Sequence, residues 1–257
     1  MPERKPLMAG NWKMHHTHLE AIQVVQKLSY RLENKDYDDV EVVVCPAFTA
    51  LRSVQTTLEG DRIPIGLGAQ NCYFETHGAF TGEVSPTMLA KLHVQYVIVG
   101  HSERRELFDE TDEIVAKKLR AVLAAGMQPI VCVGESLAQR EAGETDAFVA
   151  SQVQAAFANL ASDKAADCVV AYEPIWAIGT GLVATADQAQ EAIAFVRALV
   201  EDRDKAAGQA VRILYGGSLK PDNAPELLAL PDVDGALIGG ASLDAGSFAT
   251  IVEIARQ

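Results

Sequence analysis

The sequence lacks the features of export, membrane insertion and disulfide stapling. Its four cysteines stand far apart and form no CxxC pair, so we expect reduced thiols in a cytoplasmic protein. No stretch approaches about 18 consecutive apolar residues. The charged start Met-Pro-Glu-Arg-Lys-Pro leads into no long apolar run, so neither a membrane span nor an export signal is expected.

Positive charge is scarce. Lysine and arginine number 22 against 35 aspartates and glutamates, which leaves a formal net charge of -13, and the basic residues are scattered. This balance disfavours nucleic acid and anionic membrane surfaces as partners. A small anionic substrate stays open, because salt screens distant charge within roughly 10 Å and a few local cations or helix N-termini then dominate.

Several cofactor and catalytic motifs are also missing. The sequence has no Walker pattern, and Gly-Thr-Gly at 179–181 does not open a GxGxxG fingerprint, so nucleotide binding is not supported. No GxSxG elbow accompanies the serine beside His101, which disfavours a serine hydrolase. The cluster His15, His16 and His18 sits at a predicted helix start without a nearby cysteine, so we expect no metal site there.

What the sequence does contain is a regular series of short apolar runs. They are rich in β-branched residues and often apolar at consecutive positions, which is typical of strands buried on both faces of a parallel sheet. The eight runs are Leu7 to Trp12, Val40 to Cys45, Ile63 to Ala69, Tyr96 to Gly100, Pro129 to Val133, Cys168 to Tyr172, Val211 to Tyr215 and Val233 to Ile238.

Helical signals lie between these runs. Ser85-Pro86 offers an N-cap followed by proline, Thr185 and Gln188 have the spacing of a capping box, and Gly126 ends a segment with one apolar face. Strand and helix therefore alternate eight times at spacings of roughly 25 to 40 residues. This pattern favours an α/β protein with a (β/α)₈ barrel fold over two open sheets, and we predict a single domain over residues 1–257.

Polar residues and glycines collect after the predicted strands. In a barrel the carboxyl ends of all strands open on one mouth, so these residues are expected to become neighbours. They are Asn11 and Lys13 after the first strand, His101 after the fourth, Glu173 after the sixth, Gly216-Gly217-Ser218 after the seventh and Gly239-Gly240 after the eighth.

Each of these residues has a chemical and a purely structural interpretation. Glu173 leaves an apolar strand, where desolvation raises the pKa of a carboxylate and makes it a usable base, although a salt-bridged glutamate is equally compatible. His101 opens a predicted helix whose positive end disfavours the imidazolium, yet an isolated histidine is more often structural. Lys13 supplies either fixed charge for an anion or a solvated surface charge, and the paired glycines form either a phosphate cradle or tight turns.

Six motifs decide between these interpretations. Together, in order and spacing, they resemble the triosephosphate isomerase family over essentially the whole chain. They are Ala-Gly-Asn-Trp-Lys-Met at 9–14, Gly-Ala-Phe-Thr-Gly-Glu at 78–83, Val-Gly-His-Ser-Glu-Arg-Arg at 99–105, Tyr-Glu-Pro-Ile-Trp-Ala-Ile-Gly-Thr-Gly at 172–181, Tyr-Gly-Gly-Ser at 215–218 and Asp-Gly-Ala-Leu-Ile-Gly-Gly-Ala-Ser-Leu at 234–243.

The resemblance implies a TIM barrel that interconverts dihydroxyacetone phosphate and D-glyceraldehyde 3-phosphate through an enediolate, in glycolysis and gluconeogenesis. This family is itself the standard example of a glutamate base beside a neutral histidine, so Glu173 as base and His101 as electrophile come with the resemblance. No cofactor is implied. Asn11 and Lys13 are expected to bind substrate and assist catalysis, and the phosphate is expected on Gly179, Ser218, Gly239 and Gly240.

The resemblance also assigns supporting roles. Glu103 is expected to orient Lys13, and Ser102 to hold the base in the open state. The segment Pro174 to Ala184 is expected to form a lid over the phosphate, which Tyr215 holds closed near Ala184. Thr81 is expected in the contact between two subunits of a homodimer.

Two other functions remain open from the residues alone. A Schiff-base aldolase would need a desolvated lysine, whereas Glu103 is expected to keep Lys13 charged. A non-catalytic phosphate-binding barrel would have no need for Glu173 and His101 at the same mouth.

Overall fold

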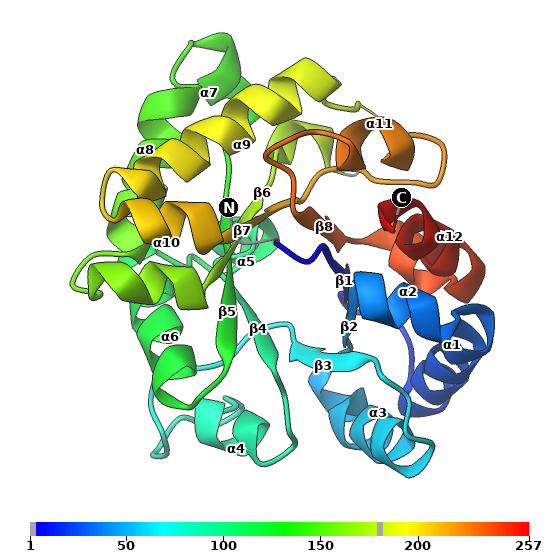
Figure 1. Cartoon of the computed structure of the whole chain (residues 1–257). Coiled ribbons are helices and arrows are strands. Elements are labelled where there is room, and N and C mark those ends of the chain that lie inside the picture. The colour runs from blue at the N-terminus through cyan, green and yellow to red at the C-terminus, as the bar shows by residue number, and fades with distance from the viewer. Residues whose placement is uncertain (1–3, 179–181, 257) are drawn as a thin grey trace.

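Eight parallel strands form a closed barrel in chain order. The computed structural model describes residues 4–178 and 182–256, and in this part of the chain each strand pairs with its sequence neighbours and the last strand pairs with the first (Figure 1). All eight predicted strands are confirmed, and their ends differ most at the third, which begins at Gly66 and not at Ile63. The strands are β1 (Leu7–Asn11), β2 (Glu41–Cys45), β3 (Gly66–Ala69), β4 (Tyr96–Val99), β5 (Gln128–Val133), β6 (Val169–Tyr172), β7 (Arg212–Tyr215) and β8 (Gly235–Ile238).

Helices surround the barrel on its outside (Figure 1). The expected caps are present: Ser85 accepts the N–H of Met88, and Thr185 forms a capping box with Gln188. The α-helices are α1 (His18–Arg31), α2 (Asn34–Asp39), α3 (Phe48–Gly60), α4 (Pro86–Ala90), α5 (Ser102–Leu107), α6 (Asp112–Ala124), α7 (Leu137–Glu141), α8 (Thr145–Ala156), α9 (Ala186–Glu201), α10 (Lys205–Ala210), α11 (Ala224–Leu228) and α12 (Ala245–Ala255). Short 3₁₀ turns are η1 (Ser162–Asp167), η2 (Ile175–Ala177) and η3 (Gly240–Leu243). Within the described residues, no helix combines the length and apolar character that a bilayer span requires.

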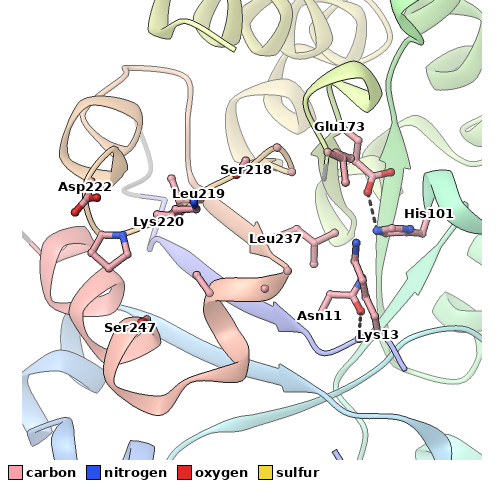
Figure 2. A pocket seen from close by; sticks show the side chains of 17 residues that line it. Asn11, Lys13, His101, Glu173, Ser218, Leu219, Lys220, Asp222, Leu237 and Ser247 are labelled. Carbon is pink, nitrogen blue, oxygen red and sulfur yellow. Dashed lines mark hydrogen bonds and ion pairs between the residues drawn. The ribbon is translucent and has the colours of Figure 1, made fainter. Parts of the chain in front are cut away.

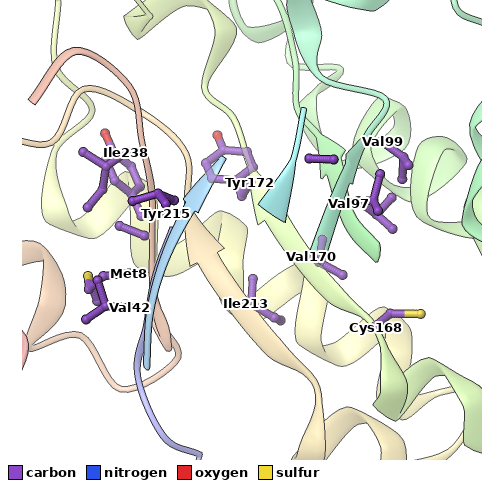
Figure 3. Packing of buried hydrophobic residues seen from close by; sticks show 14 of the residues in the cluster. Met8, Val42, Val97, Val99, Cys168, Val170, Tyr172, Ile213, Tyr215 and Ile238 are labelled. Atoms are coloured by element: carbon purple, nitrogen blue, oxygen red, sulfur yellow. The ribbon is translucent and has the colours of Figure 1, made fainter. Parts of the chain in front are cut away.

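The strand side chains divide into two cores according to the parity of their positions. Met8 belongs to the large core between strands and helices, part of which Figure 3 shows, whereas its neighbours Leu7 and Ala9 belong to a second core made only of strand residues. Successive side chains of a strand point to opposite faces, so this second core fills the barrel lumen. Its members are Leu7, Ala9, Val43, Cys45, Tyr96, Ile98, Ile130, Cys132, Val169, Ala171, Leu214 and Leu237.

The same alternation aims the polar residues at the mouth. Asn11 continues the inward series of Leu7 and Ala9, and Glu173 continues that of Val169 and Ala171. His101 is out of phase with Tyr96 and Ile98, which point inward. Gly100 between them has φ +69, a left-handed conformation that glycine adopts without strain, and it breaks the alternation so that His101 reaches the lumen side.

Barrel closure between β8 and β1 makes a prediction at Gly235. This residue has φ +131, and a Cβ atom there would stand 2.1 Å from the carbonyl oxygen of Leu7. We expect Gly235→Ala to lower the free energy of unfolding by about 3 kcal/mol, at the upper end of ordinary single substitutions. Gly143→Ala is the control, since Gly143 has φ +71 with open space around it and its replacement costs only backbone strain of about 1 kcal/mol. Equal losses in urea unfolding would contradict this account.

Candidate active site

A cavity of about 530 Å³ opens at the carboxyl ends of the strands (Figure 2). It brings together residues from β1, β4, β6, β7 and β8 or the segments that follow them. The predicted site residues among its lining are Asn11, Lys13, His101, Glu173, Ser218, Gly239 and Gly240. Gly179, which the resemblance also places at the phosphate, lies outside the described residues.

Glu173 and His101 face each other in the buried part of this cavity. Glu173 is 2% exposed and His101 6% exposed, and Nε2 of the imidazole lies 2.9 Å from Oε1 of the carboxylate (Figure 2). The other oxygen, Oε2, accepts the backbone N–H of Ser102 at 2.9 Å. Despite the short distance to Nε2, Oε1 has no partner in hydrogen-bond geometry within the described chain, so one oxygen of the carboxylate is buried without a well-aligned donor.

The tautomer of His101 follows from its second nitrogen. His101 is the N-cap of α5, and its Nδ1 accepts the backbone N–H of Glu103 at 3.2 Å. A nitrogen that accepts a hydrogen bond carries no proton, so the proton of a neutral ring sits on Nε2. That nitrogen is the one that faces Glu173 and the cavity.

The direction of both pKa shifts differs from the expectation drawn from the sequence. Burial raises the pKa of Glu173, but His101, the N–H of Ser102 and Lys13 outweigh it, so the pKa lies below its ordinary value. Burial lowers the pKa of His101, but the facing carboxylate of Glu173 outweighs it, so the pKa lies above its ordinary value. The expected raised carboxylate and lowered imidazole are wrong for this conformation, because each group is the other's close partner.

Lys13 and Asn11 form the second polar group of the cavity. The ammonium Nζ of Lys13 lies 2.6 Å from Oε1 of Glu103, which is the contact the resemblance implies. The backbone N–H of Lys13 donates to Oδ1 of Asn11 at 3.1 Å, and Lys13 has φ +52. An ideal Cβ on Gly239 would stand 3.9 Å from Nζ, so the glycine pair after β8 lies beside this ammonium.

Tyr215, at the end of β7, points away from the lumen and is fully buried. Its hydroxyl has no hydrogen-bond partner within the described residues. Burial raises the pKa of Tyr215 to about 12, and the backbone of Ala184 acts against this rise. The backbone of Ala184 therefore acts on the Tyr215 hydroxyl, but the two groups do not meet the geometry of a hydrogen bond.

Sequence reasoning missed Glu135, which follows β5. It is fully buried, and its carboxylate accepts the hydroxyl of Tyr172 at 3.0 Å and the indole N–H of Trp176 at 2.9 Å, with Arg140 at 3.1 Å. These contacts hold the chain on both sides of Glu173. The signal was weak: Gly134-Glu135 follows the fifth strand as polar residues and glycines follow five others, but no extended motif marks it.

Cys132 is a second missed neighbour of the base. It belongs to the lumen core on β5, and burial, with the charge of Glu173, raises its pKa well above the ordinary value. It is therefore an unreactive thiol beneath the carboxylate.

Thr81 lies away from the cavity, on an exposed loop. Beside it Phe80 is 40% exposed and contacts the ring of Tyr73 at 4.6 Å between centroids.

The fold and this site define a (β/α)₈-barrel protein with a buried carboxylate–imidazole pair and a lysine beside paired glycines at its mouth. The family model for triosephosphate isomerase matches residues 6–255. The triosephosphate isomerase of Streptomyces coelicolor is 53% identical over 258 residues and covers all of both chains. That of Chloroflexus aurantiacus is 54% identical over 97% of this chain and 98% of its own, and that of Corynebacterium efficiens 52% over 96% and 95%. The chain belongs to the triosephosphate isomerase family.

The coupling between Glu173 and His101 makes a prediction about titration. His101→Gln removes a cause that lowers the pKa of Glu173 and leaves burial, which raises it, so we expect the carboxylate to titrate at higher pH. A carboxyl group whose pKa is lower in the folded than in the unfolded state stabilises the fold at pH values above its unfolded-state pKa. This contribution is lost as the pH falls through the folded-state pKa. The variant should therefore lose stability at a higher pH during acidification.

Carbon-13 NMR of the Glu173 carboxyl and acid unfolding together test this expectation. His93→Gln is the control, because His93 pairs with Glu59 on the exposed surface. An unchanged Glu173 titration in His101→Gln would show that the two groups are not coupled.

Proposed function

We propose that Glu173 is the base and His101 the electrophile of this chain's reaction, the isomerisation of dihydroxyacetone phosphate and D-glyceraldehyde 3-phosphate. The observation that carries these roles is the pair itself: a buried, ionised carboxylate with one poorly bonded oxygen, 2.9 Å from an imidazole nitrogen that bears a proton. A C–H group next to a carbonyl is a weak acid. Its proton is removed only if the carbonyl oxygen is stabilised as negative charge builds on it.

The charge states of the pair fit this sequence of events. Before reaction, the neighbouring imidazole favours the ionised form of Glu173, which is the form a base needs. When Glu173 takes the carbon proton it loses the charge that raised the pKa of His101, and burial then favours the neutral ring, the state that the hydrogen bond from the Glu103 N–H to Nδ1 already requires. A neutral ring with its proton on Nε2 donates to the enediolate oxygen. The proton transfer thus favours the neutral state of His101 from which Nε2 donates.

Lys13 and the glycines supply the anionic part of the site. We assign Lys13 and Asn11 to the substrate oxygens and Ser218, Gly239 and Gly240 to the phosphate, because all five line one cavity with the pair. Glu103 keeps Lys13 oriented through the 2.6 Å contact. A preorganised cation stabilises the charge of the transition state more than that of the substrate.

Three further residues complete the assignment. We propose that Gly179 contributes to the phosphate site, that the backbone N–H of Ser102 holds the base before substrate binds, and that Tyr215 fastens the closed lid at Ala184. The hydroxyl of Tyr215, which has no hydrogen-bond partner among the described residues, supports its role, since it gains a bond when the backbone N–H of Ala184 moves into alignment and donates to its oxygen.

The two rival functions account for less of the site. An aldolase nucleophile must be a neutral amine, and Lys13 has a carboxylate 2.6 Å from its ammonium. A binding module explains the glycines but not a desolvated carboxylate–imidazole pair, which is costly to bury. Borohydride trapping of substrate on Lys13 would favour the aldolase, and absence of isomerase turnover would favour the module.

Glu173→Asp tests the base directly. It keeps the charge but withdraws the carboxylate by one methylene, and misplacement on the order of 1 Å costs about a hundredfold in rate. We expect kcat to fall by about that factor with a much smaller change in substrate affinity, in a coupled assay of isomerisation. Asp204→Glu, which alters a carboxylate that caps α10, is the control and should keep parental turnover. Parental kcat in Glu173→Asp would remove Glu173 from the mechanism.

We also propose a homodimer with Thr81 in the contact between subunits. The support is the exposed loop 78–83 with its half-exposed Phe80 and the match of this loop to the family motif. Light scattering is expected to give about twice the chain mass of 27.6 kDa, and an active monomer at assay concentration would contradict the proposal.

Two broader assignments belong with this proposal. Residues 1–257 form one folding domain, which predicts a single calorimetric transition, whereas two separate transitions would contradict it. The location is cytoplasmic, because the four cysteines are buried free thiols, the state that a reducing compartment maintains. Activity confined to an extracellular fraction would contradict this location.

A further inference from the structure

We infer that Gln70 is a positioning residue for Lys13: its side-chain amide holds the backbone of Lys13 in the strained conformation that aims the ammonium into the cavity. The inference rests on the proposed function of Lys13 as the cation of the site. Gln70 is not among the described residues that line the cavity, so it acts on the site through the backbone that it holds.

Gln70 directly follows β3, and its Nε2 makes two hydrogen bonds to the ends of the neighbouring strands. It donates to the carbonyl oxygen of Lys13 at 2.8 Å and to that of Cys45 at 2.8 Å. Both partners are acceptors only, so the group between them must be the NH₂ of the amide. The carbonyl of Cys45 also accepts the N–H of Trp12 at 3.2 Å. One side chain therefore ties together the carboxyl ends of β1, β2 and β3.

The residue held in this way has an unfavourable backbone conformation. Lys13 has φ +52, in the left-handed region that a lysine rarely adopts and that persists only where the surroundings hold it. Its N–H is held by Oδ1 of Asn11 at 3.1 Å, and its carbonyl is held by Gln70 (Asn11 and Lys13 in Figure 2). The peptide units on both sides of the Lys13 Cα are thus fixed, and together they set the direction of its side chain.

Loss of the amide would release one of these two units. The peptide after Lys13 could then rotate and bring φ back to a negative value, which redirects the side chain and its ammonium. The ammonium of Lys13 is one of the causes that lower the pKa of Glu173, so its redirection should also raise that pKa. The expected defect therefore depends on the position of the Lys13 ammonium.

The test is a double-mutant cycle with Gln70→Met, which keeps the length of the side chain and removes the donors. We expect kcat/KM for the triose phosphate to fall about tenfold or more, and the acid limb of its pH profile to move to higher pH as the pKa of Glu173 rises. In a Lys13→Met background, where no ammonium is left to position, Gln70→Met should change kcat/KM by less than about twofold, because the two residues act as a unit.

Two further variants keep the test decisive. Gln70→Glu has the same length and no donor when ionised, and it should give the same pattern if the methionine variant folds poorly. Gln190→Met is the matched control: its Nε2 donates to Asp232 at 2.6 Å outside the cavity, so its loss should lower stability and leave kcat/KM unchanged. Light scattering on each variant checks that the oligomeric state is the same.

The outcomes distinguish failure of the positioning role of Gln70 from failure of the proposed function of Lys13. Parental kcat/KM in both Gln70 variants, or an equal fall with and without Lys13, would overturn the positioning role. If Lys13→Met alone kept parental kcat/KM, the proposed function of Lys13 would fail, and the inference with it. A fall that depends on Lys13, together with an acid limb moved to higher pH, would support it.

Discussion

The rest of the structure depends on the alternation of side chains along eight parallel strands that close on themselves. Every second residue of a strand must fill the lumen. The apolar positions of each strand therefore set the direction of the polar side chains that follow it at the mouth. Asn11 and Glu173 point inward because they continue inward series on β1 and β6. His101 joins them only because Gly100 turns the chain by a conformation that other residues avoid. The site is thus an extension of the packing that forms the barrel.

Burial of Glu173 then creates the second constraint. The charge of a carboxylate taken out of water must be compensated, and here the compensation comes from an imidazole, a backbone N–H and, with the smallest effect of the three, an ammonium. Since His101 is also buried, neither group has an independent charge state. This dependence links the protonation of one to the other, so the removal of a carbon proton by the carboxylate and the donation of a proton by the imidazole become parts of one electrostatic event.

The loops at the mouth owe their shape to polar side chains of neighbouring strand ends. Glu135 holds Tyr172 and Trp176 on either side of the base. Gln70 binds the backbone carbonyl of Lys13, and Glu103 binds the ammonium of the same lysine. In each case a residue after one strand fixes the segment after another. Such cross-links suit a site that must be rigid at the reacting atoms although it is built from loops.

The sequence by itself determined the eight strands, the order of the barrel and most of the residues at its mouth. Each apolar run marks its own position, and the motifs around Lys13, His101 and Glu173 are contiguous stretches that can be read without knowing any distance. Residues such as Gln70 and Glu135 stand alone after their strands, and nothing local distinguishes them from ordinary polar residues. Only the tertiary structure decided what they contact. It also decided the direction of the pKa shifts. Burial acts on each residue separately and can be predicted from the apolar residues beside it in the sequence. The 2.9 Å contact between His101 and Glu173 joins residues that follow two different strands, so it exists only once the barrel has closed.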